Sequence, residues 1–225
     1  HTDIVLDGVG VRARGTWGPA PTSGVIRPGT VTAFAGPSGA GKSTLVACLL
    51  SDITPDAGQI RLRAQASSRD DEGLALTDVD PTSWRSAISW VPQSPTLVPG
   101  TILDNMGDLP QRDLDEAARA TGFDAVLATT PDGWNSTIGS GGVGLSVGQR
   151  QRLALTRALA ARSQVVVLDE PTAHLDAVSE ETVVRAIHAM REEGRTVIVI
   201  AHRNAIIEVA DTIIDVAHAD EEALA

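Results

Sequence analysis

A glycine-rich stretch carries the residue types in this chain that are best suited to chemistry: Gly36-Pro37-Ser38-Gly39-Ala40-Gly41-Lys42-Ser43-Thr44. It matches the phosphate-binding pattern G-x-x-x-x-G-K-[ST] at every position. Its glycines let successive N–H groups turn into one concavity for anionic oxygens, and a helix that follows adds its positive dipole end. In such a loop Lys42 reaches the β- and γ-phosphates, and the Ser43 hydroxyl is a magnesium ligand. The stretch therefore predicts a site for a nucleoside triphosphate and Mg²⁺.

The segments on either side are those that a phosphate loop requires. Thr30–Ala35 has the pattern of a short buried strand, and Leu45–Leu50 that of an apolar helix. The alternative is a glycine-rich turn that contains Lys and Ser by chance. A strand and a helix both in register favour the phosphate loop, because this context is what distinguishes a true match from a chance one.

A second stretch supplies what triphosphate hydrolysis still needs. Val165–Leu168 is a continuous apolar run, typical of a strand that is buried on both faces, and it ends in Asp169-Glu170. Asp169 can hold the magnesium through water, and Glu170 can polarise the attacking water as general base. Turns commonly begin with Asp, so the pair is weak evidence alone. Beside a phosphate loop it predicts an ATPase.

Strand and helix patterns alternate along the chain, which indicates a parallel α/β sheet. A mostly helical stretch interrupts this alternation. We therefore expect an ATP-binding core at 1–93 and 163–225 and an inserted helical lobe at 94–162. At the N-terminus we expect short strands at Ile4–Leu6 and Val9–Arg12, broken by glycines, then an irregular loop over Gly15–Gly24. We also expect the acidic tail after Val216 to be frayed.

Composition excludes several classes of protein. The chain has 18 basic and 29 acidic residues and no basic run, which disfavours binding along a nucleic-acid backbone. Its single cysteine, Cys48, excludes an internal disulfide and is expected to be a small core residue. We find no signal peptide, and the longest apolar run, Leu45–Leu50, is far shorter than the roughly 18 residues of a membrane span. The first residue is His rather than Met, so a membrane part in a longer protein stays open.

Taken in order along the chain, six stretches resemble the nucleotide-binding domain of ATP-binding-cassette (ABC) transporters. They are Gly36–Thr44, Gln93, Leu145–Gln149, Val165–Glu170, Leu175-Asp176 and His202. The resemblance covers Ile4 to Val216 and implies a phosphate-loop NTPase (RecA-like) core with an antiparallel β portion at the N-terminus. The most specific stretch is the family's L-S-G-G-Q signature, which reads Leu-Ser-Val-Gly-Gln here, with Val147 in the place of the first glycine.

The resemblance implies roles for individual residues. Gln93 would contact magnesium and the attacking water, and His202 would contact the γ-phosphate and help to position Glu170. Asp176 would communicate across a dimer. The signature residues would meet the γ-phosphate of ATP bound to a partner domain: Ser146, Val147, Gly148 and Gln149.

Three neighbouring stretches resemble exporter-type cassettes that are fused to a transmembrane half: Ser83-Trp84-Arg85, Ile88–Gln93 and Gly100–Asn105. Together with the signature they are similar to the bacterial cysteine/glutathione exporters of cytochrome bd assembly. This implies a second nucleotide-binding domain, identical or different, and a transmembrane domain absent from this sequence. It also implies a place on the cytoplasmic face of the plasma (inner) membrane.

The sequence departs from the family in three places. Family members usually stack the adenine on an aromatic residue ahead of the phosphate loop, but Ala13 stands there; Trp17 is the candidate replacement in the ATP site. Ser140 stands where exporters tend to have Glu, and His174 where small residues are common.

Two other functions stay open at this point. One is the cassette subunit of an importer whose membrane part is a separate chain. The other is an ATP-binding module that dimerises without useful hydrolysis, which Glu170 and His202 argue against.

Overall fold

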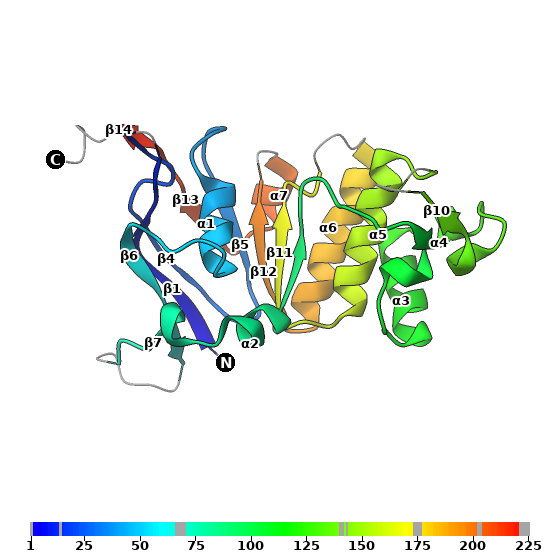
Figure 1. Ribbon diagram of the computed structural model, residues 1–225, viewed down its shortest axis with the longest axis horizontal. Coiled ribbons are helices and arrows are strands. Elements are labelled where there is room, and N and C mark those ends of the chain that lie inside the picture. The colour runs from blue at the N-terminus through cyan, green and yellow to red at the C-terminus, as the bar shows by residue number, and fades with distance from the viewer. Residues whose placement is uncertain are drawn as a thin grey trace.

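Two sheets of different character lie side by side in the computed structural model, which describes residues 2–13, 15–65, 71–139, 142, 144–172, 177–201 and 204–220 (Figure 1). The central sheet is parallel, with strand order β13-β5-β12-β11-β8. Its strands are β5 (Val31–Ala35), β8 (Ile88–Val91), β11 (Val165–Asp169), β12 (Thr196–Ile200) and β13 (Thr212–Asp215). Because all five run in one direction, their carboxyl ends meet at a single edge.

The second sheet is antiparallel, with order β4-β1-β6-β7. It consists of β1 (Thr2–Gly10), β4 (Thr22–Ile26), β6 (Ala57–Ala64) and β7 (Leu74–Ala75). Two small ribbons complete the strands: β2 (Arg12–Ala13) with β3 (Thr16–Trp17) and β14 (Ala219–Asp220), and β9 (Gly100–Thr101) with β10 (Thr137–Ile138). This is the α/β architecture with an N-terminal antiparallel portion that the sequence predicts.

One helix lies between the two sheets, and the longer helices lie on the side of the central sheet away from the antiparallel one (Figure 1). The α-helices are α1 (Lys42–Leu49), α2 (Pro81–Ser86), α3 (Gln111–Thr121), α4 (Asp124–Leu127), α5 (Val147–Ala160), α6 (Ala177–Glu192) and α7 (Asn204–Glu208). Short 3₁₀ turns are η1 (Leu76–Asp78), η2 (Leu103–Asn105) and η3 (Gly133–Asn135). Among the described residues, none of the helices has both the length and the hydropathy to cross a bilayer.

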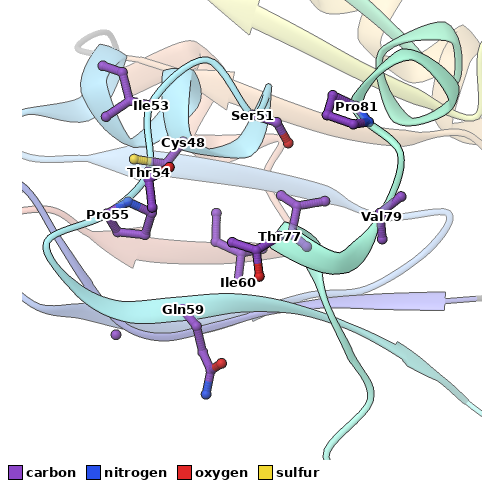
Figure 2. Close-up of a pocket in the computed structure, with 12 residues that line it drawn as sticks. Cys48, Ser51, Ile53, Thr54, Pro55, Gln59, Ile60, Thr77, Val79 and Pro81 are labelled. Carbon is purple, nitrogen blue, oxygen red and sulfur yellow. The ribbon is translucent and has the colours of Figure 1, made fainter.

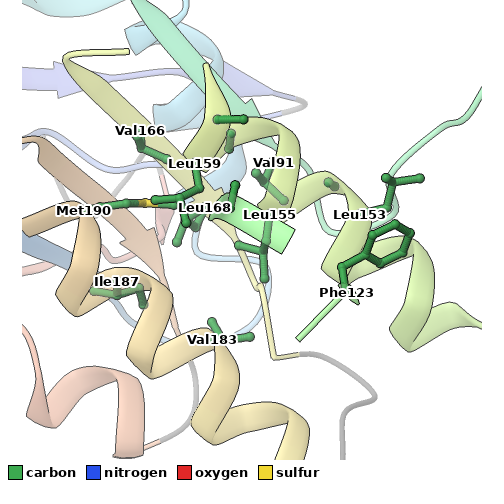
Figure 3. Packing of buried hydrophobic residues seen from close by; sticks show 14 of the residues in the cluster. Val91, Phe123, Leu153, Leu155, Leu159, Val166, Leu168, Val183, Ile187 and Met190 are labelled. Atoms are coloured by element: carbon green, nitrogen blue, oxygen red, sulfur yellow. The ribbon is translucent and has the colours of Figure 1, made fainter. Parts of the chain in front are cut away.

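The central sheet is buried on both faces, as the unbroken apolar runs predict. Along β11, Val166 and Leu168 pack on the side of α5 and α6, whereas Val167 packs on the side of α1 and the antiparallel sheet. Figure 3 shows the first of these clusters, in which Leu155 and Leu159 of α5 approach Leu168. One continuous core therefore ties the helical stretch to the strands that end at the predicted site.

The N-terminal strand differs from the prediction. Instead of two strands broken by glycines, β1 runs without interruption from Thr2 to Gly10 and pairs with β6 on one side and β4 on the other. The ladder with β6 shifts register between Asp7 and Gly10, and Gly8 has a φ of 61°. Glycine accepts this backbone at little cost, so the strand absorbs a bulge there rather than ending.

The loop predicted over Gly15–Gly24 is also more ordered than expected. It contains β3 and the start of β4, and Trp17 of β3 pairs with Ala219 of β14. The tail after Val216 is therefore paired at Ala219–Asp220 rather than frayed there. Two-residue strands form because a neighbouring segment pairs with them, and the local sequence does not indicate which segment that is.

Candidate nucleotide-binding site

The phosphate loop lies at the carboxyl edge of the central sheet. It follows β5, and α1 begins directly at Lys42, with Gly41 as its N-cap in a left-handed conformation (φ 93°). In Figure 1 this loop is the light-blue turn above α1. The strand, loop and helix that confirm a phosphate-binding pattern are all present in the predicted order.

The backbone on both sides of the loop leaves no room for side chains at two glycines. A Cβ on Gly36 would overlap the carbonyl of Val216, and a Cβ on Gly41 would overlap the backbone of Gly18 and Pro19. Both glycines also have positive φ values, 143° and 93°. The Gly18-Pro19 segment thus braces the loop from one side and Val216 from the other, a role that sequence reasoning did not assign to these residues.

We expect Gly41→Ala to destabilise the chain more than Gly39→Ala. Both glycines have positive φ, 93° and 79°, so alanine at either position is strained by about 1–2 kcal/mol. Only Gly41 adds a steric overlap, because a Cβ on Gly39 meets nothing within 4 Å. Denaturant unfolding without nucleotide measures both losses, and equal losses would contradict the bracing contact.

Lys42 lies inside its own loop. Its Nζ donates to the carbonyl oxygens of Gly36 at 2.9 Å and Pro37 at 2.8 Å, and the residue is 5% exposed. Burial lowers the pKa of Lys42, while the charges of Glu170 and Asp169 oppose that shift. The ammonium group is therefore held between the loop and the two predicted acidic residues, where an incoming anion finds a desolvated cation.

Ser43 and Asp169 meet although 126 positions separate them in the numbering. The Ser43 hydroxyl donates a hydrogen bond to the Asp169 carboxylate, which lies at the end of β11 and is 8% exposed. Burial raises the pKa of Asp169, and the Ser43 hydrogen bond and the Lys42 charge act against this rise. The two residues predicted to serve magnesium are thus adjacent.

Hydrogen bonds hold Glu170 in a strained backbone. Its φ is 47°, its N–H donates to the Ile200 carbonyl at 3.1 Å, and Gln93 Nε2 donates to Glu170 Oε2 at 2.9 Å. A non-glycine residue in this region costs of order 1–3 kcal/mol, and such strain concentrates at functional sites. Gln93 follows β8, the strand beside β11, so the edge of the sheet brings the two predicted residues together.

The donor set fits magnesium better than a metal that needs a complete protein cage. Ser43, Gln93 and Asp169 offer hydroxyl, amide and carboxylate oxygens, which Mg²⁺ prefers. In the described part of the chain no group of three or more His, Cys, Asp or Glu side chains is placed to hold a metal. Magnesium at this site would therefore draw its other ligands from water and the substrate phosphates, as is usual for this ion.

The signature stretch starts helix α5 with a complete capping box. Ser146 Oγ accepts from the Gln149 N–H at 3.2 Å, and Gln149 Oε1 accepts from the Ser146 N–H at 2.8 Å. Helix geometry leaves the N–H groups of Val147 and Gly148 without intrahelical partners, so they point outward at the positive end of the dipole. Val147 is 53% exposed, so the substituted position lies on the surface.

The signature and the phosphate loop lie at separate places along one edge of the fold. In Figure 1 the start of α5 and the phosphate loop both lie along the top, with the central sheet and α6 between them. The central sheet and α6 therefore separate the anion-binding helix start from the phosphate loop of the same chain.

Comparison with known proteins then decides the family. A sequence profile described as "ABC transporter" matches residues 20–173. This chain belongs to the ABC transporter family. The predicted phosphate-loop NTPase fold is thereby confirmed, and the chain is an ATP-binding domain of this family.

Similar proteins of this ABC family are longer than the chain. It is 37% identical over 217 residues to a mycobactin import ATP-binding/permease protein of Mycolicibacterium thermoresistibile, covering 94% of this chain and 33% of that protein. It is 40% identical over 192 residues to an ATP-dependent lipid A-core flippase of Burkholderia pseudomallei, covering 84% and 30%. The chain thus spans about a third of the length of these relatives.

A solved structure agrees with this ABC assignment over nearly the whole chain. The structure of a bacterial Atm1-family ABC exporter with ATP bound superposes with a TM-score of 0.84 at 29% identity. The match covers 99% of this chain and 39% of that one. The predicted resemblance to exporter-type cassettes is confirmed at this level, and the similarity to cysteine/glutathione exporters stays a prediction.

Not every residue predicted for the ABC site lies in the described part of the chain. Ser140, His174, Asp176 and His202 lie outside it, so their roles stay predictions. Trp17 lies next to the bracing segment Gly18-Pro19, but it is 5% exposed, packs against Gly10 and has the Arg12 guanidinium over its ring. The Arg12 guanidinium therefore covers one face of the ring, and stacking of adenine on Trp17 stays a prediction.

A hollow at the other end of α1 belongs to no part of this site. It has a volume of about 300 Å³ and lies between the end of α1, β6 and η1 (Figure 2). Cys48 lines it, and burial raises the pKa of this thiol to about 11, so it is a poor nucleophile. Cys48 is 2% exposed, which confirms it as a core residue.

Proposed function

We propose that this ABC domain is the motor of an exporter-type transporter and works as a head-to-tail pair, with each ATP held between the phosphate loop of one domain and the signature of the other. One observation carries the pairing. The hydrolytic residues and the capped start of α5 lie apart along one edge of the fold, so a single chain would present two incomplete halves. Two copies turned to face each other complete both.

The residues of the phosphate-loop half have distinct tasks in this mechanism. Lys42 exchanges the carbonyls of Gly36 and Pro37 for phosphate oxygens, and the outward N–H groups of the loop hold the β-phosphate. Magnesium, when bound near Ser43, Gln93 and Asp169, neutralises charge that develops on the β- and γ-phosphates. Binding at the loop thus positions the triphosphate for in-line attack.

Glu170 performs the proton step. As a water oxygen bonds to the γ-phosphorus, Glu170 accepts the water proton and the bond from phosphorus to the β,γ-bridging oxygen breaks, releasing ADP. The hydrogen bond from Gln93 holds one oxygen of the Glu170 carboxylate, so it fixes the direction in which the other points. The signature of the partner would supply N–H donors to the departing γ-phosphate.

The pairing implies further features that belong to this proposal. A transmembrane domain would connect to the pair, as the ATP-binding/permease names of relatives suggest, and the domain would act at the cytoplasmic face of the membrane. The helical stretch 94–162 would move as a unit against the rest of the chain. An importing protein among the relatives supports keeping import as the second candidate for the direction of transport.

The test is ATP turnover of this chain as its concentration is raised in the presence of Mg²⁺. A pair that forms from identical chains gives a specific activity that climbs with concentration, because each site needs two copies. A constant specific activity at every concentration would contradict the shared site. If activity is absent while ATP still binds, adding the membrane part or a second, different domain must restore it, or the motor function is wrong.

A further inference from the structure

The carboxyl end of α1, opposite the phosphate loop, is held by side chains from another segment. Trp84 Nε1 donates to the Leu49 carbonyl at 2.6 Å. Arg85 donates from Nε to the Leu50 carbonyl at 3.1 Å and from Nη2 to the Ser51 carbonyl at 3.2 Å. Both residues lie on α2, to which the chemistry of the phosphate site gives no task. Trp84 and Arg85 together form what we call the α2 clamp.

Helix α1 does not satisfy this end by itself. The N–H groups of residues 50–52 bond to the carbonyls of residues 46–48, in the manner of a Schellman motif. The carbonyl of Leu49 remains, and Trp84 donates to it. Ser51 occupies the left-handed position of this turn with φ 59°, where glycine is usual, and α1 has no basic residue in its last turn. The end of α1 therefore receives both its last donor and its positive charge from the α2 clamp.

One guanidinium contacts three consecutive residues at this end. Besides its two carbonyl contacts, Arg85 Nη2 lies 2.6 Å from Asp52 Oδ1. Arg85 and Asp52 are each about half exposed, so their ion pair stabilises little, and the hydrogen bonds to the carbonyls fix the geometry. Trp84 adds apolar contact, because its indole packs against the core cluster shared by α1 and the antiparallel sheet. The α2 clamp therefore holds α1 by packing as well as by hydrogen bonds.

The same segment leads into the strand that precedes Gln93. Helix α2 ends at Ser86, β8 begins at Ile88 and ends at Val91, and Gln93 follows two residues later. Strand β8 lies at an edge of the central sheet and, among the described strands, pairs with β11 alone. A strand that is paired on one side has fewer constraints on its position than a central one. The α2 clamp supplies a second constraint at its start.

We infer that Trp84 and Arg85 are positioning residues for ATP hydrolysis, because they fix β8, and with it Gln93, relative to the helix of the phosphate loop. The start of α1 lies at the phosphate loop, and its far end is connected through α2 and β8 to the amide that donates to Glu170. One helix thus sets the spacing between the triphosphate and the residue that acts on water. The inference rests on the proposed function, in which Glu170 is the general base.

Loss of the α2 clamp should slow the chemical step without weakening nucleotide binding. The phosphate contacts lie at the opposite end of α1, so the Mg-nucleotide complex should bind as before. The orientation of Glu170 toward water depends on Gln93, and a misplacement of about 1 Å in a reacting group can cost about 10²-fold in rate. We therefore expect kcat and kcat/KM to fall together, the pattern of an interaction that matters only in the transition state.

The variant that tests this combines Trp84→Phe with Arg85→Lys. Phenylalanine keeps an aromatic ring but lacks the N–H donor, and lysine keeps the charge but lacks the fork that reaches several carbonyls. The matched control combines Trp134→Phe with Arg191→Lys. Trp134 Nε1 and Arg191 Nη2 each donate to an aspartate, at 2.9 Å and 2.6 Å, so the control loses the same kinds of donor at places away from the end of α1.

Phosphate release gives kcat, in the assembly in which the parent hydrolyses ATP, and calorimetric titration with a non-hydrolysable Mg-ATP analogue gives the affinity. We expect the clamp variant to lose about 5- to 30-fold in kcat while its affinity stays within about twofold of the parent. The control should keep both values. Circular dichroism melts show whether the two double variants are equally folded. If the clamp variant does not fold, Trp84→Phe alone carries the same expectation with a smaller loss.

A second background separates positioning from a general weakening of the fold. The α2 clamp acts through Gln93, so it has little left to position once Gln93→Ala has removed the donor to Glu170. Adding the clamp substitutions to Gln93→Ala should therefore lower kcat by less than about twofold further, because residues that act as a unit are not additive.

Four results would overturn the inference. They are an unchanged kcat in the clamp variant, an equal loss in the control, the full further loss on the Gln93→Ala background, or weaker nucleotide binding in place of slower turnover. Failure of the proposed function has a different signature, because the parent chain would then hydrolyse ATP in no assembly.

Discussion

Replacing Glu170 with Gln is expected to lower ATP turnover by about 10²–10⁴-fold while ATP binding is retained, because a positioned general base contributes that factor to the rate. The amide is nearly isosteric with the carboxylate, and its oxygen can still accept the hydrogen bond from Gln93 Nε2. What it loses is the ability to take the proton from water. The substitution should leave the backbone strain at φ 47° the same, because the Gln and Glu side chains have the same branching.

Two measurements check this result. Phosphate release gives the rate, and size-exclusion chromatography with Mg-ATP shows whether the variant accumulates as a closed pair that the parent forms only briefly. Glu208→Gln is the matched control, because Glu208 lies exposed on α7 and should leave both readings unchanged. Turnover of Glu170→Gln at the rate of the parent would show that Glu170 is not the base.

Chelation of magnesium distinguishes the predicted role of Asp169 from that of Glu170. Asp169 is buried, and burial raises its pKa, so a cation nearby relieves an unfavourable charge, whereas Glu170 acts on water. Removal of Mg²⁺ should therefore abolish the ATP-dependent pairing of Glu170→Gln, which the substitution alone preserves.

The chemistry at the carboxyl edge of the sheet could be predicted because each part is local in sequence. The phosphate loop lies within nine consecutive residues, and the apolar run before Asp169 predicts a strand that is buried on both faces. Ser43, Asp169 and Glu170 were predicted from the phosphate loop and the apolar run, and Gln93 from the resemblance to ABC domains. In the fold Ser43 hydrogen-bonds to Asp169 and Gln93 to Glu170.

What sequence reasoning missed depends on contacts between distant short segments. The pairing of Trp17 with Ala219 and the bracing of Gly36 by Val216 join the two ends of the chain. A two-residue strand has no periodicity to detect, and Gly18-Pro19 indicates a turn without showing what the turn touches. The same limit explains the expectation for Trp17: the residue type suggested stacking, but only the fold places Arg12 over its ring.

Two variants that are each inactive alone should recover ATP turnover when mixed. Lys42→Ala removes the cation from the phosphate loop, and Gly148→Asp places a carboxylate at the helix start that should receive the γ-phosphate of the partner. In a pair made of one copy of each, the intact phosphate loop of the second variant faces the intact signature of the first. One complete site then forms, and the other carries both defects.

Both substitutions are expected to leave the folded chain stable, so inactivity alone reports on the site. Burial lowers the pKa of Lys42, so removing its ammonium relieves a desolvation cost. Gly148 lies in the first turn of α5 with helical backbone, where an acidic residue favours the dipole by about 0.3–1 kcal/mol. Circular dichroism melts of the two variants confirm this before they are mixed.

Turnover is then measured as the proportion of the two variants is changed at constant total concentration. Shared sites give zero activity at either extreme and a maximum near equal amounts, since mixed pairs are then most abundant. Two copies of Lys42→Ala offer no working loop, and two copies of Gly148→Asp offer no working signature. A mixture that stays inactive at every proportion, although each variant exchanges partners, would mean that each chain completes its own site, contrary to the separation of α5 from the phosphate loop in the fold.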